Sequence, residues 1–205
     1  MTPREIPVRA RRIACFFLIG VTVVEGIPLA SGFAGDARRL IGGAHATPLA
    51  WALALVIAAI FIRLSVSRHP LIREHLFTLS LLKALAIPMA LVSGIFEEVF
   101  FRAFLMNLAQ RGGWGGLDQV LISAVSFGLA HGVWGLFGRS VRIAAGAVVA
   151  TGLLGAALAF VYLVGGRSVV PCALAHALIN LVIEPWLILS AAAGKWGTSE
   201  PAATK

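Results

Sequence analysis

Hydrophobic positions along the chain gather in long blocks that short polar stretches separate. Within each block the apolar residues follow one another without the strict alternation that a membrane-spanning strand requires. A helix that crosses a bilayer takes about 20 apolar residues, which is close to the length of most blocks. The blocks cover residues 13–33, 48–66, 76–110, 117–136, 141–164 and 169–193. The pattern predicts an all-α fold, a polytopic membrane helix bundle of about six to eight transmembrane or interfacial helices around a central polar cavity.

The third block, residues 76–110, is too long for one ordinary span. As a continuous helix it would extend roughly 50 Å, whereas the hydrocarbon core of a bilayer is about 30 Å thick. We therefore expect a break near Pro88 or Gly94, with a short or interfacial helix on one side of it. Residues 1–205 are expected to form a single integral membrane domain, and the polar tail 194–205 is expected to be disordered.

The composition agrees with a membrane protein and excludes most soluble classes. Of the 205 residues, 59% are hydrophobic and 13% are charged, whereas an ordinary soluble domain has about 25% charged residues. The net charge is +8, but the arginines lie between apolar blocks and form no basic cluster interleaved with aromatic residues. This arrangement gives no support for a nucleic-acid partner, and it fits the positively charged loops of a protein embedded in the lipid bilayer.

The distribution of Lys and Arg between the spans predicts the orientation of the chain. With six spans and the N-terminus inside, the inside segments hold eleven such residues and the outside segments hold four. Because positive loops stay on the cytoplasmic side, this excess predicts a multi-pass protein of the cell membrane with its N-terminus in the cytoplasm. A double crossing by residues 76–110 would invert the later half, so the topology after residue 88 depends on the predicted break.

Four of the apolar stretches contain ionisable or strongly polar residues. A charge at mid-bilayer costs about 2.5–3.5 kcal/mol on insertion scales and usually marks a function. The stretches are the one around Glu25, EEVFFR from Glu97 to Arg102, SFGLAH with Phe127 and His131, and CALAHALIN with His176 and Asn180. On helices, three pairs of these residues lie four positions apart and share a face: Glu98 with Arg102, Phe127 with His131, and His176 with Asn180. Three helices can thus present polar groups to one shared cavity.

The chemistry of these groups suggests hydrolysis. Glu97 points about 100° away from Glu98 around the helix, so it is free of Arg102. An unpaired carboxylate, two imidazoles and a carboxamide can activate a water molecule and stabilise an oxyanion. Glu97, His131 and His176 are also ordinary ligands of a divalent metal such as zinc, which leaves a metal site as an alternative. Each motif alone fits a structural role as well, but their joint occurrence favours a functional site.

Three further charged residues have no assigned chemistry. Glu25 lies in a stretch that a proline can kink, where it can pair, reach the interface or take part in function. Glu184 precedes Pro185, so it can cap a break in the last span or line the cavity. Lys83 is expected to extend its ammonium group toward the membrane interface.

The three motifs together resemble a known family. In chain order they read E-E-x-x-x-R at Glu97–Arg102, F-x-x-x-H at Phe127–His131 and H-x-x-x-N at His176–Asn180. This series resembles the CAAX-protease and bacteriocin-processing (CPBP, also called ABI) family of intramembrane proteases, whose eukaryotic members remove the last three residues of prenylated proteins. The resemblance covers residues 82–186 and implies that this part is a CPBP-like catalytic core.

The resemblance also implies a role for each motif residue. Glu97 is similar to the glutamate that activates water, and His131 to the partner that positions the water or donates a proton. His176 and Asn180 are similar to the groups that bind the oxyanion or complete a metal site. The expected catalytic residues are thus Glu97, His131, His176 and Asn180, with Glu98, Arg102 and Phe127 in support. The family has been described both as metal-dependent and as glutamate-dependent, so a zinc ion on Glu97, His131 and His176 stays an alternative.

The function implied by this resemblance is an intramembrane endopeptidase that acts on a membrane-associated protein or peptide. One alternative is a non-catalytic membrane scaffold or a bacteriocin self-immunity protein that keeps the cavity for binding. Another is a small proton-coupled transporter with Glu and His as a relay, although the inverted repeat that many transporters carry is not visible. No motif indicates the substrate, the cleavage site or the oligomeric state.

Overall fold

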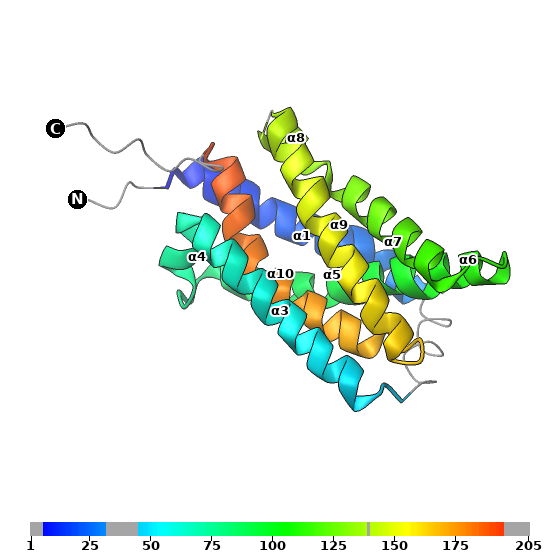
Figure 1. Cartoon of the computed structure of the whole chain (residues 1–205). Coiled ribbons are helices and arrows are strands. Elements are labelled where there is room, and N and C mark those ends of the chain that lie inside the picture. Colours follow the sequence, from blue (N-terminus) through cyan, green and yellow to red (C-terminus); the bar gives the residue numbers. More distant parts are fainter. Residues whose placement is uncertain (1–5, 32–44, 139, 195–205) are drawn as a thin grey trace.

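The computed structural model describes residues 6–31, 45–138 and 140–194, and in this part the chain is helical without any strand. Figure 1 shows the helices packed as a bundle. In chain order they are α1 (Val8–Ser31), α3 (Pro48–Arg68), α4 (Pro70–His75), α5 (Leu81–Glu98), the π-helix η1 (Val99–Met106), α6 (Asn107–Arg111), α7 (Gly116–His131), α8 (Trp134–Gly138), α9 (Val141–Val164) and α10 (Val170–Ala192). The all-α prediction is confirmed.

Six of the described helical runs are long and apolar enough to cross a membrane. They are Val8–Ser31, Pro48–Arg68, Leu81–Arg111, Gly116–Phe137, Val141–Val164 and Val170–Ala192. The prediction of a multi-pass membrane protein is thereby confirmed. The orientation and the single domain stay predictions, and most of the predicted tail, from residue 195 on, lies outside the described residues.

The predicted break at Pro88 or Gly94 is wrong. α5 continues through both residues to Glu98 and then passes into η1 and α6, so Leu81–Arg111 is one helical run. A membrane helix tolerates proline because neighbouring groups satisfy the freed carbonyl, and Gly94 is held by close packing against α10. What changes instead is the winding, since a π-helix occupies Val99–Met106. Such wide turns are often found at functional sites, and this one begins directly after Glu97 and Glu98.

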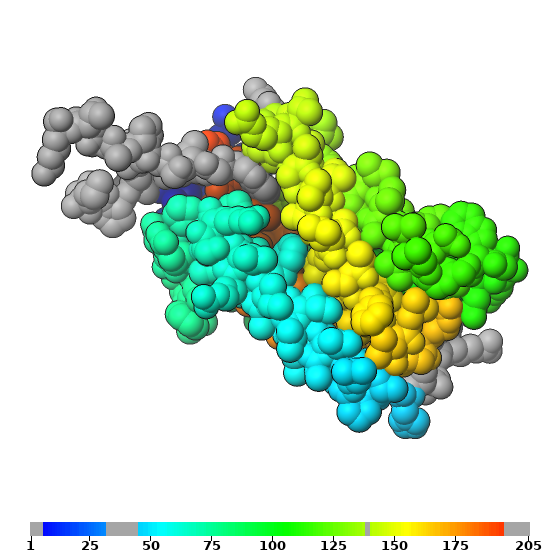
Figure 2. Space-filling model, viewed as in Figure 1, coloured from blue at the N-terminus to red at the C-terminus, as the bar shows by residue number. Residues whose placement is uncertain are grey.

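α10 is the central helix of the bundle. In its most apolar window 61% of the residues are buried, compared with 11% in α1, and it packs on α5, α3, α1 and α9. Figure 2 shows α3 and α9 on the near face, with part of α10 visible between α3 and the beginning of α9. Because α10 touches so many elements, side chains on its different faces can meet groups from most of the other helices.

Two glycines let the helices approach closely. A Cβ atom on Gly94 of α5 would lie 2.9 Å from the Ala177 nitrogen of α10. A Cβ atom on Gly128 of α7 would lie 2.6 Å from the Val148 carbonyl oxygen of α9. Small residues at helix contacts are a main source of association in membranes, where there is no hydrophobic drive between helices. These contacts bring α5 against α10, and α7 against α9, at the level of the polar motifs.

Candidate active site

Glu98 is the centre of a buried ionic group that joins α5, η1 and α10. Its Oε2 lies 2.9 Å from Arg102 Nε, and both side chains are completely buried. Its Oε1 accepts a hydrogen bond of 2.8 Å from Nδ1 of His176. The Glu98–Arg102 pairing expected from the four-residue spacing is present. The contact with His176 offsets more of the cost of burying the carboxylate. It uses only Nδ1 of the imidazole, so Nε2 takes no part in it. His176 also lines the cavity described below.

Arg102 is held on its other side by aromatic rings. Its guanidinium carbon lies 4.8 Å from the centre of the Phe127 ring and 6.0 Å from that of Phe101. Phe127 also makes an edge contact with the His176 ring, with 5.5 Å between the centres. A cation over a desolvated ring gains about 2 kcal/mol. Phe127 therefore supports the ionic group by packing rather than by polar chemistry.

Glu97 has different neighbours, although it is adjacent to Glu98 in the chain. Its Oε1 accepts a 2.6 Å hydrogen bond from the Ser93 hydroxyl, and its Oε2 lies 3.7 Å from Nε2 of His131. Nδ1 of His131 donates to the Phe127 carbonyl oxygen at 2.9 Å, so the other nitrogen is directed at Glu97. The two side chains keep 14% and 18% exposure. Glu97 and His131 thus form a second pair that is less deeply buried than the first.

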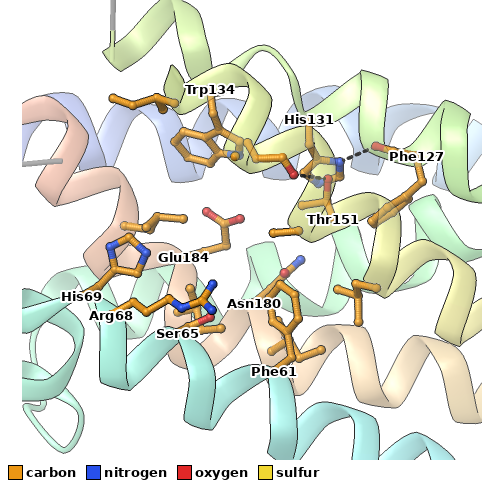
Figure 3. Close-up of a pocket in the computed structure, with 18 of the residues that line it drawn as sticks. Phe61, Ser65, Arg68, His69, Phe127, His131, Trp134, Thr151, Asn180 and Glu184 are labelled. Atoms are coloured by element: carbon orange, nitrogen blue, oxygen red, sulfur yellow. Dashed lines mark hydrogen bonds between the residues drawn. The ribbon is translucent and has the colours of Figure 1, made fainter. Parts of the chain in front are cut away.

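A cavity of about 530 Å³ lies between α3, α7, α9 and α10. His131, His176 and Asn180 line it, whereas Glu97 is not among the lining residues and lies behind His131, 3.7 Å from its Nε2. In Figure 3 the side chains of His131, Asn180 and Glu184 point toward one common space. The structure therefore brings together all four residues expected to be catalytic, from three parts of the chain.

Three polar residues of this region were left without a role, or were missed, by sequence reasoning. Ser93 donates to Glu97 and accepts from Asn180 Nδ2 at 3.5 Å. Glu184 lines the cavity, and Glu25 lies within electrostatic reach of both Glu97 and Ser93. Four-residue spacing could have indicated two of them, since Ser93 precedes Glu97 by four positions and Glu184 follows Asn180 by four. Glu25 comes from a distant helix and has no such signal.

The side chains do not fit the zinc site that the sequence left as an alternative. In the described part of the chain, no group of three or more His, Cys, Asp or Glu residues is placed to hold a metal ion. The reason lies in the two histidines. His176 is turned toward Glu98 and His131 toward Glu97, so the predicted ligands Glu97, His131 and His176 do not meet around one point.

Comparison with known proteins gives one family. The family model described as type II CAAX prenyl endopeptidase Rce1-like matches residues 76–182. The match includes every residue of the three motifs, while Glu25 and Glu184 lie outside it. The comparison with curated proteins gives no match, and neither does the comparison with solved structures.

Proposed function

Since the chain belongs to the Rce1-like type II CAAX prenyl endopeptidase family, we propose that it is an intramembrane endopeptidase in which Glu97 activates the attacking water. The substrate is a membrane-associated protein or peptide, bound in the cavity beside His131. The observation that carries this proposal is the difference between the polar partners of two adjacent glutamates. Among the described residues, Glu98 is neutralised by Arg102 and His176, whereas Glu97 accepts a hydrogen bond from the Ser93 hydroxyl and lies beside the His131 imidazole.

The reaction follows from these positions. A water molecule in contact with Glu97 and His131 gives a proton to the Glu97 carboxylate as its oxygen attacks the carbonyl carbon. The carbonyl oxygen becomes an oxyanion, to which Asn180 Nδ2 can donate. Because Nδ1 of His176 already donates to Glu98, its Nε2 donates to the oxyanion when the ring carries both protons. When the C–N bond breaks, the proton taken from water passes to the leaving amine, directly or through His131. Atoms and charge balance without a further reactant.

The buried ionic group serves this reaction by positioning. Glu98 and Phe127 hold the ring of His176, and the Phe127 carbonyl oxygen holds that of His131. A displacement of about 1 Å in a reacting group can cost a hundredfold in rate. Glu98, Arg102 and Phe127 are therefore proposed as positioning residues rather than catalytic ones.

The first test is a cleavage assay in membranes against co-expressed candidate substrates encoded by neighbouring genes. Glu97→Gln keeps the shape and removes the base, so we expect cleavage to fall by roughly 10²–10⁴-fold at normal expression. His131→Ala should also lower cleavage severely. The matched control is Glu74→Gln, because Glu74 lies exposed on α4, and it should cleave like the wild type.

Two outcomes contradict the proposal. If Glu97→Gln and His131→Ala both cleave at the wild-type rate, Glu97 is not the base. If no substrate is cut by any variant and the cellular phenotype survives both substitutions, the cavity serves binding, and the scaffold or self-immunity alternative takes over. Glu98→Gln gives a separate readout, because loss of a partner in a buried ionic group destabilises the fold by about 3–5 kcal/mol.

A further inference from the structure

Glu25 of α1 has no part in the proposed reaction, although it lies beside the proposed base. α1 packs on α5 and α10, and a Cβ atom on Gly26 would lie 3.8 Å from the Val92 side chain of α5. Next to this contact, the Glu25 side chain interacts with the Ser93 hydroxyl and lies within electrostatic reach of Glu97. α1 lies outside residues 76–182, so the family match does not indicate a role for this glutamate. Its contacts have to indicate that role.

Ser93 is the buried residue at which three polar side chains meet. It is 3% exposed. Its hydroxyl donates a hydrogen bond of 2.6 Å to Glu97 Oε1, and its oxygen accepts a long one of 3.5 Å from Asn180 Nδ2. Glu25 is the third partner and comes from a different helix. Ser93 therefore joins the proposed base to a proposed donor for the oxyanion, and Glu25 is in contact with this junction.

The donors and acceptors around the Ser93 hydroxyl leave only a donor role for Glu25. A serine hydroxyl has one proton to donate and two lone pairs that accept. As the base, Glu97 is a carboxylate in the resting enzyme, so it can only accept, and it takes that one proton. Asn180 Nδ2 is a donor and occupies one lone pair. The other lone pair can bind Glu25 only if Glu25 carries a proton of its own.

The charges around Glu25 favour the same protonation state. It faces Glu97 and Ser93 on α5, and His176 and Glu184 on α10. His176 already donates to another glutamate, and the ion pairs between described side chains do not include Glu25. Its Oε2 is buried and has no hydrogen-bond partner among the described residues. A second negative charge beside an ionised base is costly where the dielectric constant is low, and a carboxylic acid avoids this cost by keeping its proton.

We propose that Glu25 is a positioning residue that carries a proton and donates a hydrogen bond to Ser93, so that the Ser93 hydroxyl stays directed at Glu97. This inference rests on the proposed function, because it concerns the residue named there as the base. Ser93 holds Oε1 of Glu97, while Oε2 faces His131, where the proposed reaction places the water. Successive hydrogen bonds in one chain polarise one another. The proton on Glu25 therefore also strengthens the bond that holds the base.

Infrared spectroscopy measures the proton on Glu25 without turnover. The full-length protein is kept at neutral pH in dodecyl maltoside, a detergent that has no carbonyl group. A protonated carboxylic acid gives a C=O stretching band that is separate from the amide and carboxylate bands and shifts in D₂O. We expect Glu25→Gln to lose such a band. The control Glu74→Gln, which replaces an exposed glutamate of α4, should keep it.

The same band reports on the contact with Ser93. In Ser93→Ala the acid loses its acceptor, so the band should remain but move to the frequency of a more weakly hydrogen-bonded carboxylic acid. Two results overturn the proposal. If wild type and Glu25→Gln have the same spectrum in this region, Glu25 is ionised. If the band has the same frequency in wild type and Ser93→Ala, Glu25 does not donate to Ser93.

Cleavage in membranes measures whether this proton orients the base. Glu25→Leu removes the donor, so we expect cleavage per folded molecule to fall about tenfold, which corresponds to one such hydrogen bond. Glu25→Gln still has an N–H group to donate and should keep most of the activity that Glu25→Leu loses. The matched control is Thr22→Val, one turn earlier on α1, where the lost hydroxyl bonds to the Leu18 carbonyl oxygen of the same helix. It should cleave like the wild type.

A double-mutant cycle separates action through Ser93 from a general effect of Glu25 on the fold. Ser93→Ala alone should lower cleavage about tenfold, because the base loses its hydrogen bond. In this background Glu25→Leu should have almost no further effect. Additive losses, or a loss in Glu25→Gln as large as that in Glu25→Leu, contradict the proposal. If Glu97→Gln cleaves like the wild type, the proposed base is wrong, and the infrared spectra still decide the proton on Glu25 and its contact with Ser93.

Discussion

At the scale of single residues, Lys83 shows how the chain accommodates a charge within a span. Its Nζ donates a 2.7 Å hydrogen bond to the Leu181 carbonyl oxygen of α10. Four positions after Leu181 comes Pro185, which has no N–H, so that carbonyl lacks its helical partner. The expectation that Lys83 reaches toward the membrane interface stays a prediction, and the contact that the structure shows is with α10. Its ammonium group satisfies the one acceptor that the proline leaves open.

This role of Lys83 predicts a coupling with Pro185. Lys83→Met removes the donor and should destabilise the protein by about 1 kcal/mol, the usual size of an interhelical hydrogen bond in membranes. Pro185→Ala restores an N–H that can bond to Leu181, so in that background Lys83→Met should cost almost nothing. Thermal unfolding in detergent of the wild type, both single variants and the double variant measures the coupling. Additive effects would show that Lys83 acts elsewhere.

Some contacts in the candidate site could be predicted from the spacing of residues along one helix, and others could not. Glu98 and Arg102 could be paired from the sequence, because residues four apart on a helix share a face. The partner of Glu98 on the other side is His176, which lies 78 positions away. Only the packing of α5 against α10 determines that contact. The family resemblance indicated His131 as the partner of Glu97, but it did not indicate that His176 pairs with Glu98.

At the scale of helices, the contact of α5 with α10 sets the geometry of the site. Gly94 lies one helical turn before Glu98, and the backbone of α10 passes directly over it. The same contact places His176 within 2.8 Å of Glu98. The ionic group therefore depends on a position that carries no polar chemistry itself.

We expect Gly94→Ala to separate these helices. The new Cβ would lie 2.9 Å from the Ala177 nitrogen and 3.1 Å from the Ala173 carbonyl oxygen, which are backbone atoms that cannot turn aside. Overpacking of this kind costs about 1–3 kcal/mol, and the Glu98–His176 contact should lengthen, so both thermal stability and cleavage should fall. The control is Gly20→Ala in α1, where the added atom meets nothing within 4 Å and stability should stay equal or rise. A neutral Gly94→Ala would contradict the close approach.

The helices themselves were largely predictable, whereas their winding was not. Composition and length determine where a span begins and ends, and the span predicted at 141–164 agrees with Val141–Val164. The predicted break at Pro88 was wrong because the effect of a proline in a membrane helix depends on neighbouring helices, which the local sequence does not show. The π-helix Val99–Met106 was not predicted for a similar reason, since its residues have the pattern of an ordinary apolar α-helix.

At the scale of the whole molecule, the candidate site and a separate hydrogen-bond network lie toward opposite ends of α7 and α9. His131 at the end of α7 and Ser140, which caps α9, both line the cavity. At the other ends of these helices, Arg167 donates to Asn107 at 2.7 Å and to Gln119 at 2.6 Å. Its guanidinium carbon also lies 5.7 Å from the centre of the Tyr162 ring. This network ties α6, α7 and α9 to the turn before α10, with Arg167 itself in a left-handed conformation at a φ of 66°.

Substitution of Arg167 separates the network from the conformation that positions it. Arg167→Ala removes both hydrogen bonds and keeps the strained φ, so we expect a loss of about 2 kcal/mol, measured by thermal unfolding in detergent. Arg167→Gly removes the same bonds but relieves strain worth roughly 1–2 kcal/mol for a residue with a side chain, so it should be the more stable of the two. Because Gln119 and His131 are separated by twelve positions, about 18 Å along α7, cleavage per folded molecule should be unchanged in both variants. A loss of cleavage at temperatures where Arg167→Gly is still folded would contradict this expectation. It would show that the Arg167 network affects the candidate site at the other end of α7.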